Sequence, residues 1–135
     1  MNYPLSEVEG MTATGEARLK AAGIRSAATL LERASSVKGR KVLADKTGLT
    51  EKQLLDWANS ADAMRIPGVG KTKVALLRAA GVNTVRELGY RNPERLAKSM
   101  CEANATRKLL RARPTAESVG KMIECARKLP IKISY

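Results

Sequence analysis

The sequence contains no histidine and no phenylalanine, and only four of its 135 residues are aromatic. Because imidazole is absent, Ser-His and Cys-His couples and imidazole general bases are excluded. No other catalytic constellation stands out, so we expect a protein that is not an enzyme. A zinc site would have to rely on cysteine and carboxylates alone, and we expect neither a metal ion nor a cofactor.

Cysteine and long apolar runs are also scarce. Cys101 and Cys125 are the two cysteines, and they form no C-x-x-C motif. Such isolated cysteines are typical of reduced, half-buried thiols that pack inside a cytoplasmic protein. No apolar run reaches the ~20 residues of a membrane span, and residues 1–20 lack the apolar region of a secretory signal. We therefore expect a cytoplasmic protein without a membrane partner.

Negative charge is scarce in one half only. Residues 1–63 contain nine Lys/Arg and eight Asp/Glu, whereas residues 64–135 contain sixteen and five. The second half therefore carries nearly all of the net charge of +12. A local excess of this size attracts polyanions, and it favours nucleic acid or another anionic surface as the partner.

What the sequence does contain is an internal repeat. Residues 8–30 align without gaps with residues 66–88, and 8 of the 23 positions are identical. A preserved order of glycine, helix and Ala-Ala-Gly indicates a duplication. We therefore divide the chain into a first repeat at residues 1–63 and a second, basic repeat at residues 64–135.

Helical patterns fill nearly the whole chain and predict an all-α fold of about ten short helices. Capping boxes are predicted at Thr50 and Thr84, and an N-cap followed by proline at Asn92. Only residues 131–135 alternate as a strand does, and residues 3–5 are their one possible partner.

Residues 64–77 carry the most chemical information. The pattern predicts a helix that ends near Arg65, a tight turn bearing Gly68 and Gly70, and a second helix from Lys71. The first turn of that second helix exposes unpaired amides and the positive end of the helix dipole. Such a cradle suits an anion, and a phosphate in particular.

The side chains around these amides agree with a phosphate site. Val69 is expected to fill the interior of the hairpin, while Lys71 and Lys73 add positive charge on either side of Thr72. A P-loop is excluded because Arg65 stands where its first glycine would fall. A dinucleotide fingerprint is excluded because Lys73 stands at its third glycine.

This segment resembles the helix-hairpin-helix motif of DNA-repair, recombination and polymerase-associated proteins. The match rests on Ile66, Gly68, Val69, Gly70, Val74 and Leu77, with Val74 in place of the usual alanine. The resemblance implies sequence-independent contact between the hairpin amides and the nucleic-acid backbone. The predicted binding residues in this segment are Gly68, Val69, Gly70, Lys71, Thr72 and Lys73, with added charge from Arg65 and Arg78.

The first copy of the hairpin, at Gly10, Met11 and Thr12, departs from this pattern. Thr12 replaces the second glycine, and Glu9 and Glu16 place negative charge where a phosphate would lie. Electrostatics therefore favours a structural hairpin that keeps its shape and binds anions poorly.

Over nearly its whole length the chain resembles a bacterial family of tandem helix-hairpin-helix proteins, catalogued as domain of unknown function 4332. The likeness rests on residues 3–10, 57–59, 91–94 and 128–130. It implies two helix-hairpin-helix repeats, each a SAM-like helical bundle, packed as a pseudo-symmetric module, and it implies no activity. Some relatives are thought to bind haem; the absence of histidine excludes histidine ligation here, and cysteine or methionine ligation is not expected.

A second basic segment, residues 104–114, has no counterpart in the first repeat. Arg107 and Arg111 are four residues apart and would share one face of a helix, with Lys108 and Arg113 beside them. Two interpretations stay open: the segment extends a phosphate-tracking surface, or it is a solvated basic turn.

The first hairpin is preceded by only a short segment, so it lacks the helix that precedes the second. We predict that the helix at residues 116–128 takes this place, with Met122 and Ile123 packed near Leu5 and Val8. The same exchange between two chains would give a homodimer.

Together these observations predict a non-enzymatic module that binds the nucleic-acid backbone largely independently of sequence, with double-stranded DNA favoured. The alternative is a helical protein–protein interaction module with structural hairpins and an acidic or self partner. A small-ligand carrier built around Trp57 is a third possibility, but the helical spacing of Trp57 with Leu54 and Ala61 favours a core position.

Overall fold

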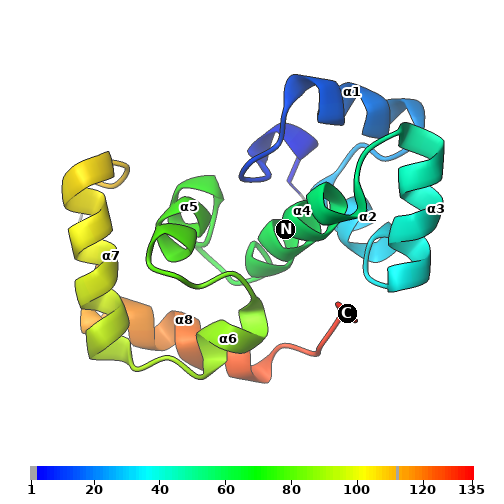
Figure 1. The fold of residues 1–135 in the computed structure, drawn as a ribbon. Coiled ribbons are helices and arrows are strands. Elements are labelled where there is room, and N and C mark those ends of the chain that lie inside the picture. The colour runs from blue at the N-terminus through cyan, green and yellow to red at the C-terminus, as the bar shows by residue number, and fades with distance from the viewer. Residues whose placement is uncertain (1–2, 112) are drawn as a thin grey trace.

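The computed structural model describes residues 3–111 and 113–135. Within these residues the chain forms eight α-helices and one short 3-10 helix, and no strand (Figure 1). The all-α prediction is confirmed, with fewer helices than the ten expected. In chain order the elements are η1 (Leu5–Glu7), α1 (Ala13–Ala21), α2 (Ala27–Arg33), α3 (Val37–Thr47), α4 (Glu51–Ala63), α5 (Lys71–Ala79), α6 (Val85–Gly89), α7 (Pro93–Arg107) and α8 (Ala116–Lys128).

Side-chain caps define the start of every one of these α-helices except α5. In each capped helix, the N-cap oxygen accepts a hydrogen bond from the backbone amide three residues further on. These N-caps are Thr12, Ser26, Ser36, Thr50, Thr84, Asn92 and Thr115. The predicted capping box at Thr50 and the predicted cap at Asn92 are confirmed. The box predicted at Thr84 forms only in part, because the Glu87 carboxylate binds the Asn83 amide and Arg91 instead.

Helices at corresponding places in the two halves make corresponding contacts. Helix α4 contacts α2 and α3, and α8 contacts α6 and α7 in the same order. The connections that follow α1 and α5 also match, since Gly23 and Gly81 adopt left-handed φ angles of 88° and 90°. The chain thus forms two groups of four helices, α1–α4 and α5–α8, in which α4 and α8 make matching contacts (Figure 1).

The prediction for the C-terminal helix is wrong. Helix α8 packs on α6 and α7, and it lies at the lower edge of the molecule in Figure 1, whereas η1 lies near the top. The helix that covers the first hairpin is α4, whose Trp57 indole donates to the Gly10 carbonyl at 3.0 Å. Because α4 already fills this place, an exchange of α8 gives no reason to expect a dimer.

The segment that follows α8, residues 130–135, is called the tail below. It forms no strand and does not pair with residues 3–5, the one possible partner that the sequence offered. Instead, the Ser134 amide donates to the Ser35 carbonyl at 2.8 Å, and the Ala27 amide donates to the Tyr3 carbonyl at 2.8 Å. The tail therefore crosses from the second group of helices to the first.

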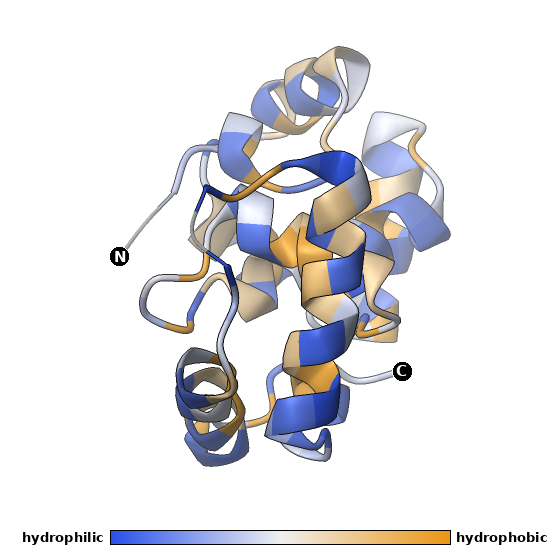
Figure 2. Ribbon diagram, turned by 90° about the vertical axis from the view of Figure 1, so that its left-hand side faces the viewer, coloured by the Kyte–Doolittle hydropathy of each residue, from blue (hydrophilic) through white to orange (hydrophobic). Residues whose placement is uncertain are grey.

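The buried side chains form one continuous hydrophobic core that includes both groups of helices. Figure 2 shows hydrophilic and hydrophobic residues mixed along each helix, as expected for amphipathic helices around a shared core. Trp57 is buried in this core, as its spacing predicted. The thiols of Cys101 and Cys125 are free and half-buried, again as predicted.

Candidate nucleic-acid interface

The second turn, residues 66–70, connects the end of α4 to the start of α5. The Val69 amide donates to the Ile66 carbonyl at 3.0 Å, and Gly68 has a left-handed φ of 82° that favours glycine. Pro67 and Gly68 are exposed, whereas the Val69 side chain is fully buried. The predicted arrangement of a buried Val69 beneath an exposed tip is confirmed.

Helix α5 begins without a side-chain cap. Its N-cap, Gly70, has φ −113° and ψ −165°, an extended conformation that any residue can adopt. A Cβ atom at Gly70 would meet nothing within 4 Å, so the fold does not require glycine here. The first-turn amides of Lys71, Thr72 and Lys73 have no acceptor within the helix, and Gly70 supplies none.

Two lysines stand beside these uncapped amides. The Lys73 ammonium lies 4.0 Å from the position that a Cβ on Gly68 would take, which places it over the turn. Lys71 is exposed and makes one long contact, 3.4 Å from its Nζ to the Ser6 carbonyl oxygen. The ion pairs between residues of the described ranges involve neither lysine. Amides, dipole and ammonium groups therefore converge on one exposed tip that can accept an anion.

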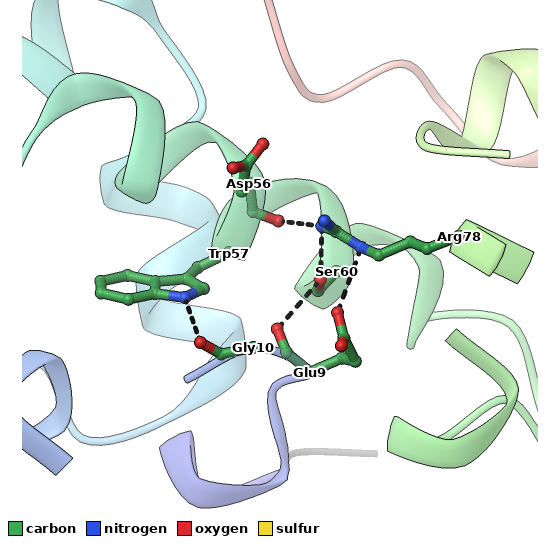
Figure 3. Close-up of polar contacts among 6 residues, drawn as sticks. All are labelled: Glu9, Gly10, Asp56, Trp57, Ser60 and Arg78. Carbon is green, nitrogen blue, oxygen red and sulfur yellow. Dashed lines mark hydrogen bonds and ion pairs between the residues drawn. The ribbon is translucent and has the colours of Figure 1, made fainter. Parts of the chain in front are cut away.

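Arg78 was predicted to add charge to this site, but the structure uses it internally (Figure 3). Its guanidinium donates to the Asp56 carbonyl at 2.6 Å and to the Ser60 hydroxyl at 2.7 Å. Its Nε also pairs with the Glu9 carboxylate at 3.3 Å. Arg78 thus joins α5 to α4 and to the first turn, so we remove it from the candidate interface.

Arg65 is also held by internal contacts. Its Nε donates to the Asp62 carboxylate at 2.7 Å, and its Nη2 donates to the Pro130 carbonyl at 3.0 Å. Burial raises the pKa of the Asp62 carboxyl, although the Arg65 guanidinium acts in the opposite direction. Arg65 therefore anchors the tail to the end of α4, and it contributes to the candidate interface only as a nearby charge.

The basic segment after α7 does not form the predicted helical face. Helix α7 ends at Arg107 because Lys108 adopts a left-handed φ of 51° and the Asn104 side chain closes the following loop. The Asn104 amide group donates to the Leu110 carbonyl at 3.0 Å and accepts from its amide at 2.8 Å. Arg111 therefore lies outside the helix and shares no helical face with Arg107.

These cations remain exposed and belong to the same half as the second turn. Arg107, Lys108, Arg111 and Arg113 are all exposed, and Arg113 makes one long contact with the Cys101 sulfur at 3.4 Å. Helix α7 contacts α5, and its C-terminal end rises to the level of α5 in Figure 1. The segment is thus placed to add a second group of positive charges beside α5.

The first turn, residues 8–12, has the same backbone geometry as the second. The Met11 amide donates to the Val8 carbonyl at 3.1 Å, and Gly10 has a φ of 83°. Its helix, however, is capped by its own chain, because the Thr12 hydroxyl accepts from the Gly15 amide at 2.9 Å. The expectation that residues 10–12 keep the shape of the second copy is confirmed.

Sequence reasoning missed the contact that covers the first turn. Trp57 packs against Gly10 and Gly15, and a Cβ at Gly15 would lie only 2.5 Å from the indole ring (Figure 3 shows the indole donating to Gly10). The available signal was Gly15 itself, since a glycine inside a helix often marks the close approach of another group. At the matching position of the second repeat stands Lys73.

The described residues contain no group of three or more His, Cys, Asp or Glu side chains that could hold a metal ion. Among the helices given above, none is long and apolar enough to cross a membrane. The family described as domain of unknown function (DUF4332) matches residues 9–129, and the chain belongs to this family. No curated protein and no solved structure matches the chain significantly.

Proposed function

We propose that this chain is a non-enzymatic module that binds the nucleic-acid backbone, with double-stranded DNA as the favoured form. Helix α4, the second turn and α5 would act as a helix-hairpin-helix unit, and the first turn would be its structural counterpart. The strong positive charge of residues 64–135 supports a polyanionic partner.

In this proposal one phosphate group lies at the start of α5. The amides of Lys71, Thr72 and Lys73 donate to its oxygens, and the α5 dipole adds favourable electrostatic energy. The ammonium groups of Lys71 and Lys73 approach the same phosphate from either side. Contacts of this kind read no base edge, so binding is largely independent of sequence.

The observation that carries the proposal is the uncapped start of α5. Every other α-helix given above has an N-cap side chain that occupies one of its first-turn amides. Gly70 leaves these amides open although its backbone conformation and surroundings would accept a side chain. A capping side chain at position 70 would compete directly with a bound phosphate.

Exposed cations beyond the turn extend the surface that a strand could follow. Arg107, Lys108, Arg111 and Arg113 would supply weaker, screened attraction to neighbouring phosphates. The module should bind duplex DNA with a dissociation constant on the order of 10⁻⁴–10⁻⁶ M at physiological salt, as is usual for non-specific contacts.

The direct test is a double variant, Gly70→Asp with Lys71→Glu, measured for duplex DNA binding by fluorescence anisotropy across a salt series. Aspartate at position 70 can cap α5, so the variant should fold while the phosphate site is blocked. We expect affinity to fall at least about tenfold and the salt dependence to become shallower.

A matched control changes the net charge equally on the other half of the molecule. Lys41→Glu with Val42→Asp alters two exposed positions of α3 and should affect binding much less. Equal losses in the two variants would mean that overall charge, not the second turn, drives binding. Binding of the wild type that ignores salt would favour a protein partner instead, and parallel titrations with single-stranded DNA and duplex RNA establish the preferred form.

A further inference from the structure

A cavity of about 290 Å³ lies between α6, the C-terminal end of α8 and the tail. Its apolar lining includes Val85, Ala126 and Leu129. Tyr90 and Ile131 also line it and are 79% and 76% exposed, so the apolar surface continues outward from the cavity. Large exposed apolar side chains grouped around a cavity mark a site for a ligand or a protein partner.

Positive charge surrounds this apolar surface. Arg86, Arg127 and Lys132 line the cavity together with the Asp62–Arg65 pair. Arg86 and Lys132 are exposed, and the ion pairs between residues in the described ranges include neither of them. The Asp62 carboxylate in the lining is already paired with Arg65. An occupant should therefore carry negative charge around an apolar group.

The tail offers backbone groups along one side of the cavity. It leaves α8 in an extended conformation and then runs without helix or turn into the first group of helices (Figure 1). Arg65 binds the Pro130 carbonyl at 3.0 Å, while Ser134 donates its amide to Ser35 and accepts from Arg40 at 2.6 Å.

The hydrogen bonds of the tail backbone therefore fall on Pro130 and Ser134, which are four residues apart. In the described parts of the chain, no hydrogen bond joins the backbone groups of Ile131, Lys132 or Ile133 to another residue. The strand-like alternation of residues 131–135 thus meets no strand among the described residues.

We infer that this surface docks an extended acidic peptide of a protein partner, which adds as a strand to the tail and places an apolar side chain in the cavity. Strand addition combines main-chain hydrogen bonds with pockets for side chains. Here the tail offers backbone groups that have no partner in the described chain, and the cavity offers one pocket. A nucleic-acid strand fits less well, because it has no main-chain N–H groups to pair with the carbonyl groups of the tail. The site is separate from the second turn, so it does not depend on the function proposed above.

The test uses a fluorescein-labelled peptide of about six residues, the usual length of a strand, that alternates glutamate with valine. We expect fluorescence polarisation to show saturable binding to the full chain. The variant Arg86→Glu with Lys132→Glu should weaken binding about tenfold. Lys41→Glu with Lys46→Glu on α3 makes the same change in net charge and should leave binding nearly unchanged. Equal losses in both variants would overturn the proposal.

Backbone pairing is tested at Ile131, whose side chain is mostly exposed. Ile131→Pro removes the amide donor, and Ile131→Ala keeps it while removing the same side chain. We expect the proline variant to bind the peptide about fivefold more weakly than the alanine variant. Equal affinities would exclude strand addition.

Two further titrations separate this site from the second turn and from nucleic acid. Gly70→Asp with Lys71→Glu should bind the peptide as the wild type does, and weaker binding there would contradict an independent site. The proposal would be overturned in favour of nucleic acid by two results together. The chain would fail to bind the peptide, and it would bind a single-stranded oligodeoxynucleotide in a way that depends on Arg86 and Lys132. Circular dichroism of each variant verifies that it is folded.

Discussion

The first and second turns share one backbone geometry but differ in what surrounds them. In each turn an amide donates back across the turn at 3.1 or 3.0 Å, and the glycines have φ angles of 83° and 82°. The first turn is covered by Trp57 and its helix is capped by Thr12. The second has an exposed tip and an uncapped helix.

Three of the positions that differ between the two turns match their different surroundings. Thr12 corresponds to Gly70, Gly15 to Lys73, and Glu9 to Pro67. In the first turn these residues cap α1, admit the indole and pair with Arg78. In the second they leave the amides open, supply an ammonium group and remove a carboxylate. The first turn is thus held by contacts within the fold, while the second leaves the first-turn amides of α5 without a side-chain cap.

The largest expected effect is a loss of stability when Trp57, which packs on the first turn, is replaced. Trp57→Ala removes a buried aromatic ring and the bond to Gly10, and it should lower the free energy of unfolding by about 3–5 kcal/mol. Trp57→Phe keeps most of the packing and should cost about 1–2 kcal/mol, largely because the hydrogen bond to Gly10 is absent. Urea unfolding followed by circular dichroism measures both. A Trp57→Ala variant as stable as the wild type would show that the indole does not support the first turn.

A glycine-to-alanine change should lower stability clearly at Gly15 in the first repeat and little at Gly70 in the second. Gly15→Ala places a Cβ 2.5 Å from the indole and should destabilise by about 1–3 kcal/mol, although alanine is the better helix former. Gly70→Ala meets no neighbour within 4 Å and should change stability by less than about 1 kcal/mol. Thermal unfolding of the two variants side by side makes the comparison, and equal destabilisation would contradict it.

Variants of Arg78 and Lys71 test whether the first residue stabilises the fold and the second binds DNA. Arg78→Met removes two hydrogen bonds and the ion pair with Glu9, and it should lower the free energy of unfolding by about 1–2 kcal/mol. Lys71→Met should leave stability unchanged and weaken DNA binding several-fold. Denaturant unfolding measures the stability of both variants, and fluorescence anisotropy measures their DNA binding. If Arg78 were a phosphate ligand, Arg78→Met would weaken DNA binding and leave stability unchanged.

The smallest expected effect is the pH dependence of stability that arises from Asp62, near the end of α4. Burial raises the pKa of the Asp62 carboxyl in the folded protein above its ordinary value of 3.8, so folding disfavours the ionised form. The resulting cost is fully present at neutral pH and disappears as pH falls through the folded pKa toward 3.8. Relative to Asp62→Asn, the wild type should therefore gain stability as pH is lowered. Denaturant titrations at several pH values check the sign, and a relative decrease at low pH would contradict it.

Local sequence signals predicted much of the fold and of the second turn. Capping residues, glycines and apolar spacing placed the helix starts at Thr50 and Asn92, the turn at Gly68 and the burial of Val69. These features depend on residues close in sequence, so the pattern contains the needed information.

Most of the errors involve side-chain contacts that form only once the chain has folded, between residues whose pairing no sequence motif indicates. The sequence did not reveal that α4 covers the first turn, so α8 was assigned to that place. It showed Arg78 as a free cation because Glu9, Asp56 and Ser60 come together only in the folded chain. The end of α7 was missed because it depends on the side chain of Asn104 binding a residue in the next loop.

The most direct test of the central claim gives the second turn the cap of the first. Gly70→Thr should let a hydroxyl accept from the Lys73 amide, as Thr12 does from Gly15, with no change in net charge. Stability should stay equal or rise by a few tenths of a kcal/mol. Duplex DNA affinity at low salt should fall about tenfold, and the slope of log K against log salt should shrink by about 0.9 for each phosphate that the protein no longer neutralises. A folded Gly70→Thr variant that binds DNA with the affinity and salt slope of the wild type would contradict the account.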